Sequence, residues 1–287
     1  MSRSALIAAV DTIDVRSWQE FVETQQALAG PRLRLWLFRG QDDPHSGLAT
    51  TLERALQRFG QGLDGQEDLE HRLLREFRRH YHRYTDDVPS EDDTLRWLAL
   101  MRHHGAPTRL LDFSYSPYVG LFFAIHGAAH GSAATIWAVD HNWCIDCARR
   151  LLPAEAWQAF QDDAWGGKTG PTVRRLFQTH ARTVVPLNPY YLDARLAVQQ
   201  GALLAPLSLG ESFESLLLAM DEPAELRRHV RRFVIHCDPG FLETALGELL
   251  RMNVTHTSLF PGIDGLAQGL ENGALLAFLS SRRRRER

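Results

Sequence analysis

The sequence has little cysteine and almost no lysine. Its three cysteines, Cys144, Cys147 and Cys237, are an odd number without framework spacing, which argues against a disulfide-stapled scaffold and is typical of a reducing compartment. Lys168 is the only lysine, so arginine carries nearly all of the positive charge. A codon bias toward arginine explains this, and no chemistry follows from it.

Long apolar runs are also absent. The apolar stretch at residues 5–10 is too short for the core of a secretion signal, and no small-residue cleavage pattern follows it. No apolar run in the sequence is long enough to cross a bilayer. We therefore expect a cytoplasmic protein with no membrane partner.

The overall composition is that of an ordinary globular protein. The chain has 287 residues, enough to bury a core without disulfides or metal, and 44% of them are hydrophobic. The formal net charge is −3 at pH 7, so the chain as a whole is not drawn to nucleic acid or to an acidic membrane surface. Composition alone therefore names no ligand.

The order of the expected helices and strands predicts the fold class. Helices dominate the first part and strands the later part, which favours an α+β fold with a mixed β-sheet core over a doubly wound sheet. We expect an N-terminal helical extension at residues 1–35, a main domain at 36–275 and a basic tail at 276–287. Helical patterns and caps occur at 15–30, 67–84 and 90–104, from Pro117 onward, and around 153–162, 211–220 and 240–251. Strand patterns occur at 32–40, 134–140, 181–187, 195–207 and 232–238.

The segment "HHGAPTRLLDFSYSP", residues 103–117, places many polar groups between two helices that both look buried. A plain turn would need only a glycine and a proline. Ser116 before Pro117 predicts a capped helix start, and a helix N-terminus beside an arginine is suited to binding an anion. Arg109, together with Arg39 from the early strand, would supply the charge for a phosphate group.

Other polar side chains of this segment would complete a nucleotide site. The hydroxyl groups of Thr108 and Ser114 suit ribose hydroxyls or amides. A free carboxylate at Asp112 would repel a phosphate, so we expect it to orient an arginine. A purely structural alternative stays open, in which Asp112 pairs with Arg39 or Arg109 and ties a buried loop.

Four separate segments stand out along the chain. They are "FRG" at 38–40, "HHGAPTRLLDFSYSPYVGLFFA" at 103–124, "RLAVQQGAL" at 195–203 and "SLFPGIDGLAQGL" at 258–270. In this order, over residues 36–270, they resemble the FRG domain family of bacteria and phages, which is named after its Phe-Arg-Gly. The resemblance implies a place near mobile elements and anti-phage or toxin systems. It also implies a motif order similar to that of ADP-ribosyltransferase-like folds, which bind NAD.

The resemblance implies roles for individual residues. In ADP-ribosyltransferase-like folds an early-strand arginine or histidine binds NAD, and Arg39 takes that position here. Ser114, Ser116 and Thr108 correspond to a middle strand or loop rich in serine and threonine. Gln200 lies where the late strand of a transferase carries its glutamate. Glutamine cannot serve as the anion that stabilises an oxocarbenium ion, so this difference bears directly on catalysis.

Three classes of function follow. The first is an NAD-binding ADP-ribosyltransferase or NAD glycohydrolase, acting as a toxin or anti-phage effector, with Arg39 and Gln200 in the catalytic site. It would act on a protein or nucleic-acid acceptor and have an immunity protein as partner. The second is a non-catalytic nucleotide-binding or interaction module that has lost the acid, unless Glu211 or Glu214 replaces it. The third is a hydrolase or nuclease that uses His104, in the last turn of a helix, as its acid or base, with Asp112 orienting it.

Metal binding is not predicted. His141, Cys144 and Cys147 follow one another at three-residue steps, but a structural zinc site needs a fourth ligand and none is near in the sequence. The segment "GGKTGP" at 166–171 lacks the earlier glycine of a phosphate-binding loop, and we interpret it as a turn. NAD is therefore the only cofactor or substrate that we expect.

The nucleotide-binding hypothesis makes one geometric prediction. Arg39, Arg109, Asp112 and Ser116 should converge on one concave site, although the early strand is far from the polar segment in sequence.

Overall fold

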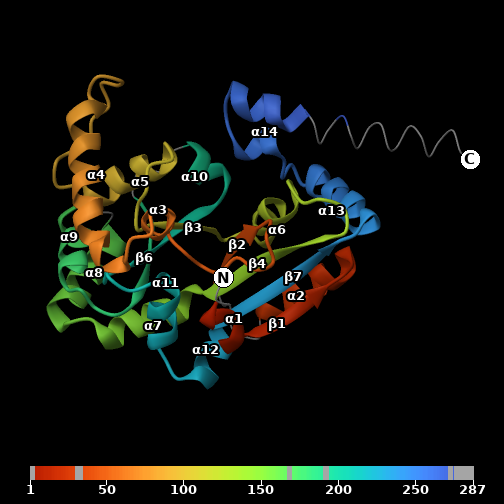
Figure 1. Ribbon diagram of the computed structural model, residues 1–287, viewed down its shortest axis with the longest axis horizontal. Coiled ribbons are helices and arrows are strands. Elements are labelled where there is room, and N and C mark those ends of the chain that lie inside the picture. The colour runs from red at the N-terminus through yellow and green to blue at the C-terminus, as the bar shows by residue number, and fades with distance from the viewer. Residues whose placement is uncertain (1–3, 30–34, 167–169, 190–193, 271–273, 275–287) are drawn as a thin grey trace, which may run out of the picture.

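A seven-stranded sheet forms the centre of the protein, in the order β1-β7-β4-β2-β3-β6-β5. The computed structural model describes residues 4–29, 35–166, 170–189, 194–270 and 274 (Figure 1). β1 pairs with β7 in parallel, and the other neighbouring strands are antiparallel, so the predicted α+β fold with a mixed sheet is confirmed. The strands are β1 Asp11–Val15, β2 Trp36–Gln41, β3 Leu111–Ser114, β4 Ser132–Asp140, β5 Val184–Leu187, β6 Gly201–Pro206 and β7 Val230–Cys237.

Helices cover both faces and both ends of this sheet. Figure 1 shows α4, α5 and α9 gathered at one end of the molecule and α2, α13 and α14 at the other. None of the helices within the described part of the chain is both long and apolar enough to span a membrane. The helices are α1 Ala5–Ala9, α2 Trp18–Ala29, α3 Thr51–Arg58, the 3-10 turn η1 Leu63–Gly65, α4 Gln66–Tyr81, α5 Thr94–His103, α6 Pro117–Ile125, α7 His141–Leu151, α8 Ala154–Gly166, α9 Gly170–Gln178, α10 Ala194–Val198, α11 Phe213–Ala219, α12 Pro223–His229, α13 Pro239–Arg251 and α14 His256–Leu259.

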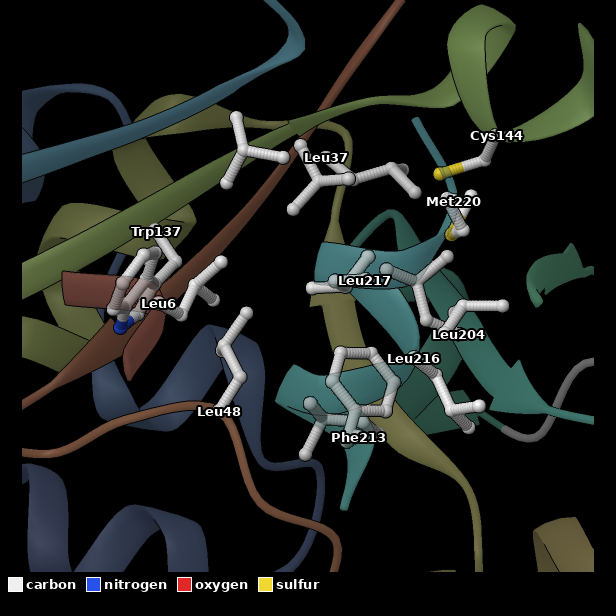
Figure 2. Close-up of a cluster of buried hydrophobic side chains, with 14 of the residues drawn as sticks. Leu6, Leu37, Leu48, Trp137, Cys144, Leu204, Phe213, Leu216, Leu217 and Met220 are labelled. Atoms are coloured by element: carbon white, nitrogen blue, oxygen red, sulfur yellow. The ribbon is translucent and has the colours of Figure 1, made fainter. Parts of the chain in front are cut away.

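Alternation along the strands sends apolar side chains to both faces of the sheet. On one face, Leu37 and Trp137 pack with side chains of α1, α7 and α11, among them Leu6, Cys144 and Phe213 (Figure 2). The two cysteines of α7 are therefore core residues. The opposite face carries two further apolar clusters, one under α2, α6 and α13 and one under α5, α8 and α9.

The two clusters on that second face are separated by polar residues of β3. Phe38 of β2 lies opposite Ser114, and Asp112 lies opposite Leu203 of β6. Opposed residues of antiparallel strands point to the same face. Phe38 belongs to the α6 cluster and Leu203 to the α5 cluster, so β3 places Ser114 and Asp112 in the gap between them. Polar side chains of β3 therefore lie between the two apolar clusters on this face.

Three predicted regions differ from the structure. Residues 195–207 were expected to form one strand, but they form α10, a turn and then β6, because Gln200 has a φ of 47° and breaks the extended backbone. The expected loop after residue 107 contains the short strand β3. The N-terminal residues 1–35 contain β1 between their two helices, and this strand joins the central sheet. The basic tail at 276–287 lies outside the described residues.

The glycine of the Phe-Arg-Gly segment has a packing role. Gly40 lies against Gly120 of α6, and a Cβ at Gly40 would overlap the Gly120 carbonyl oxygen and come within 2.5 Å of the Ala124 nitrogen. A Cβ at Gly120 would in turn lie 2.9 Å from the Phe38 Cβ. The β2 backbone and α6 therefore approach more closely than side chains would allow.

We predict that Gly40→Ala strongly destabilises the fold, because its methyl group meets helix backbone that has no room to shift. The free energy of unfolding should fall by an amount at or above the upper end of the ~1–3 kcal/mol range for overpacked cores. Urea unfolding measures this change. Gly127→Ala is the matched control, since a Cβ at Gly127 would meet nothing within 4 Å. A Gly40→Ala protein as stable as the control would contradict the prediction.

A buried carboxyl group connects α3 to α11. Glu53 is 1% exposed, and its Oε1 accepts hydrogen bonds from the backbone nitrogens of Phe213 (3.1 Å) and Thr50 (3.4 Å). Burial raises the pKa of Glu53 to about 7, the hydrogen bonds oppose this rise, and the nearby Glu214 adds to it.

This raised pKa predicts a pH-dependent stability. Between the unfolded and folded pKa values the folded protein binds more protons at Glu53 than the unfolded chain does, so this contribution to stability is lost as pH rises toward 7. From pH 5 to pH 8, wild type should lose about 2–3 kcal/mol more of its unfolding free energy than Glu53→Gln does. Urea unfolding at both values tests this, with the exposed Glu155→Gln as a control that keeps the wild-type slope. Parallel slopes in wild type and Glu53→Gln would refute it.

Candidate functional site

A cavity of about 180 Å³ lies at the junction of β2, β3, α6 and α10, and we name it the Arg39 pocket. A smaller cavity of about 50 Å³ adjoins it along α5 and β6, because the two share Arg102, Asp112, Phe113, Arg195 and Gln199. The Arg39 pocket is lined by Phe38, Arg39, Gly40, Arg102, Asp112, Phe113, Ser114, Val119, Phe123, Arg195 and Gln199.

Arg39 is positioned at the point where β2 and β3 separate. Within the described strands the register between them is the single pair of Phe38 and Ser114. The Arg39 Nη1 donates to the backbone carbonyl oxygen of Asp112 at 2.8 Å, and its buried Nε has no hydrogen-bond partner among the described residues. Arg39 and Asp112 therefore do lie together, as the sequence predicts, although they are 73 positions apart.

The pocket has an excess of positive charge. The guanidinium group of Arg102, from α5, forms an ion pair with the Asp112 carboxylate. Burial lowers the pKa of Arg39 to about 10, Asp112 opposes this, and the positive charges of Arg102 and Arg54 add to it. Arg39 is thus still protonated at neutral pH. Arg195 is a further cation on the pocket wall, so one carboxylate faces several arginines.

The four segments that resemble the FRG family meet at this pocket. Ser114 Oγ donates to the Gln199 carbonyl oxygen at 2.7 Å, which joins the second segment to the third. Gln199 Nε2 donates to the Leu259 carbonyl oxygen at 2.9 Å, and the Arg195 guanidinium carbon lies 4.4 Å from the centre of the Phe260 ring. These contacts connect the third segment to the fourth. With Arg39 from the first segment, all four contribute to or contact the site.

Arg109 does not lie in this pocket, so the predicted convergence of Arg109 with Arg39 is wrong. Arg109 is 4% exposed and pairs with the buried Glu70 of α4. Its backbone nitrogen donates to Glu70 Oε1 at 2.9 Å and its Nε to Oε2 at 2.6 Å. Its guanidinium carbon also lies 4.0 Å from the centre of the Phe177 ring. Arg109 therefore ties the segment before β3 to α4. This is the structural role that the sequence analysis left open for Arg109, but its partner is Glu70 and not Asp112.

Thr108 and Ser116, two of the residues expected to offer hydroxyl groups, do not line the pocket. Thr108 is fully buried, and its backbone nitrogen donates a hydrogen bond to Thr51 Oγ1 at 3.0 Å. Ser116 is the predicted N-cap of α6 and accepts a hydrogen bond from the Val119 nitrogen at 3.4 Å. Ser114 is the one of the three expected hydroxyl residues that lines the pocket.

The other predicted catalytic residues lie outside the lining. His104 is the exposed C-cap residue of α5, while its neighbour His103 lines the smaller cavity. Gln200 is exposed in the turn before β6. Glu211 pairs with Arg182 at 2.7 Å, and Glu214 accepts hydrogen bonds from Ser4 and from the Leu48 nitrogen. Both glutamates are thus engaged in contacts away from the pocket.

The structure adds three pocket residues that the sequence analysis missed, namely Arg102, Arg195 and Gln199. Arg102 lies in the last turn of α5, one position before the quoted polar segment. Gln199 is adjacent to Gln200, and only the helix-to-turn change at residues 194–201 decides which of the two faces the pocket.

Comparison with known proteins supports the resemblance for the first two segments. The family model of the FRG domain matches residues 34–132, which run from β2 to the start of β4 and include Arg39, Arg102 and Asp112. No curated protein and no solved structure matches the chain. The third and fourth segments lie outside the matched range, so the extension of the domain to residue 275 stays a prediction. The chain therefore contains an FRG domain over residues 34–132.

Proposed function

We propose that the Arg39 pocket binds a phosphate-bearing nucleotide of the NAD class. The observation that supports this is the buried Arg39 Nε without a partner among the described residues, in a pocket where cations outnumber carboxylates. A guanidinium group binds a phosphate through paired charge-assisted hydrogen bonds. A bound phosphate would give the Arg39 Nε an acceptor and would offset the repulsion from Arg102.

The size of the pocket limits how much of the ligand it encloses. At about 180 Å³ it is smaller than the roughly 300–1,000 Å³ of pockets that enclose a whole drug-sized ligand. The pocket therefore suits one phosphate and the adjoining ribose, and the remainder of a dinucleotide would extend past Phe123 and Arg195 on its wall. This makes the phosphate, and not the base, the main recognition element.

Glycosyl transfer is the second candidate function, as an ADP-ribosyltransferase or NAD glycohydrolase. Such chemistry needs an anion beside the developing oxocarbenium ion. Asp112 is the carboxylate residue that lines the pocket in the described part of the chain, and its charge is already paired with Arg102. Binding without turnover is therefore favoured, with Asp112 as the candidate acid if turnover occurs. A toxin or anti-phage role, with its acceptor and immunity partner, stays a prediction from the resemblance.

The first test concerns phosphate recognition. Arg39→Ala should weaken NAD binding by about 1.5–3 kcal/mol, the range for a hydrogen bond to a charged group. Arg102→Gln should weaken it as well, because the pocket loses a second cation. Calorimetric titration with NAD and with ADP-ribose measures both effects, and nicotinamide riboside, which has no phosphate, should bind much more weakly than either.

Arg149→Ala serves as the control for this test, since Arg149 is an exposed arginine of α7. Melting curves of all variants show whether Arg39→Ala is folded. If Arg39→Ala does not fold, Arg102→Gln still tests whether the pocket cations contribute to NAD binding. Equal NAD affinity in wild type, Arg39→Ala and Arg102→Gln would end the nucleotide proposal. Absence of NAD and ADP-ribose binding in wild type would do the same.

The second test separates binding from catalysis. Wild type incubated with NAD should release no nicotinamide above the protein-free blank, because the pocket carboxylate is paired. Gln200→Glu should change neither binding nor release, since that side chain is exposed in a turn. Chromatography of the reaction mixture measures nicotinamide. Release that Asp112→Asn abolishes would instead establish the glycohydrolase function and make Asp112 its acid.

A further inference from the structure

A second and larger cavity lies between α4, α5 and α9, and we name it the α4 groove. It measures about 580 Å³ and shares no lining residue with the Arg39 pocket. Leu74 and Leu98 form apolar parts of its wall, and Phe177 lies beside them. In Figure 1 these three helices stand together at one end of the molecule. The groove is therefore a separate concave site within the described residues.

The floor of the α4 groove is formed by a buried ion pair and is electrically neutral. Arg109 and Glu70 pair there, with side chains that are 5% and 3% exposed. Phe177 packs against the Arg109 guanidinium group on the other side. Because the backbone and side chain of Arg109 satisfy both carboxylate oxygens, this ion pair needs no ligand. The charge that remains available in the groove comes from its walls.

Arg78 of α4 is one of these wall charges. Its Nη2 donates to the Glu91 carbonyl oxygen at 3.0 Å, and its guanidinium carbon lies 5.3 Å from the centre of the Trp97 ring. These two contacts hold the guanidinium group in one orientation. Its Nε is buried without a hydrogen-bond partner, and no carboxylate pairs with Arg78 among the residues that the structure describes. Arg78 is thus an ordered cation with an unused donor.

Arg174 of α9 places a second cation near Arg78. Burial lowers the pKa of Arg78 and the charge of Arg174 lowers it further, while Glu91 and Asp92 oppose these effects. The contact of Arg174 with Asp92 is long, at 3.7 Å, and both side chains are largely exposed. Such an exposed pair contributes little, so Arg174 is free to turn toward an anion in the groove. An anion between the two helices would relieve their repulsion.

We propose that the α4 groove is a second anion site, which takes a phosphate-bearing ligand of mononucleotide size. The phosphate would lie between Arg78 and Arg174, and the apolar side chains of Leu74 and Leu98 would contact the base. A volume of about 580 Å³ is within the roughly 300–1,000 Å³ of pockets that enclose a whole small ligand. Arg75 and Arg79 also line the groove, but each pairs with Glu76. Glu67 and Glu91 add negative charge to the lining that would repel a longer polyanion, which favours a mononucleotide over a nucleic-acid strand.

Calorimetric titration with 5′-AMP tests this proposal, and Arg39→Ala is the background in which it is done. That background weakens phosphate binding at the Arg39 pocket, and all groove variants are compared within it, so the outcome does not depend on the proposed function of that pocket. We expect one AMP site, and we expect Arg78→Gln and Arg174→Gln each to weaken it by about tenfold or more. Adenosine lacks the phosphate, so its affinity for the Arg39→Ala background should be no higher than the affinity of the Arg78→Gln and Arg174→Gln variants for AMP.

Arg72→Gln is the matched control, because Arg72 is an exposed arginine of α4 that pairs with Asp68 and does not line the groove. It should leave AMP affinity unchanged, and melting curves should show all variants folded. Arg78→Lys gives a second readout, since it keeps the charge and loses the planar guanidinium group, and it should bind AMP more weakly than the control does. Equal affinity in Arg78→Gln, Arg174→Gln and Arg72→Gln would overturn the proposal. The proposal would also be overturned if single-stranded RNA bound in an Arg78-dependent way while AMP did not bind. That result would make the groove a nucleic-acid surface.

Discussion

The direct contact between the β2 backbone and α6 determines where the polar chemistry of this protein lies. Gly40 and Gly120 bring strand and helix together without an intervening side chain, and the residue before Gly40 is Arg39. Because this contact fixes the end of β2, it also fixes the place where β2 and β3 part. The Arg39 side chain then reaches the Asp112 carbonyl oxygen across that separation. In the Phe-Arg-Gly segment, Gly40 thus allows the close packing of β2 on α6, and the adjacent Arg39 supplies the candidate binding group.

Arginines in this fold fall into two physical groups. The backbone nitrogen, Nε and Nη2 of Arg109 all contact the buried Glu70 carboxylate, and these contacts hold α4 against the segment that leads into β3. Arg39 and Arg78 instead donate to backbone carbonyl oxygens and keep a buried Nε without a described partner. A buried cation with an incomplete set of acceptors is unfavourable unless a ligand completes it. This difference separates the arginines that stabilise the fold from those suited to recognise a phosphate.

Local signals in the sequence predicted the long elements, and the resemblance of the separate segments predicted the convergence of Arg39 with Asp112. Long-range contacts account for what was missed. Ser116 and Pro117 correctly mark the start of α6, since capping depends on adjacent residues. The role of Arg109 depends on Glu70, which is 39 positions away on another helix, so no local pattern reports it. Gln199 lines the pocket in place of the predicted Gln200, which lies in a turn with a positive φ that an extended-strand pattern does not reveal. Short strands such as β3 and β1 have too few residues for a clear alternating pattern.

The parallel pairing of β1 with β7 constrains the order in which the protein acquires its structure. Thr12 and Arg232 are in contact although 220 positions separate them, so β1 leaves the ribosome long before its partner exists. β7 also covers the outer edge of β4, which stays unpaired until β7 has been synthesised. An unpaired strand edge is prone to intermolecular pairing, and distant contacts form slowly. A nascent or truncated chain that ends before β7 therefore leaves β1 without a partner strand and exposes the edge of β4, which makes aggregation more favourable until β7 is added.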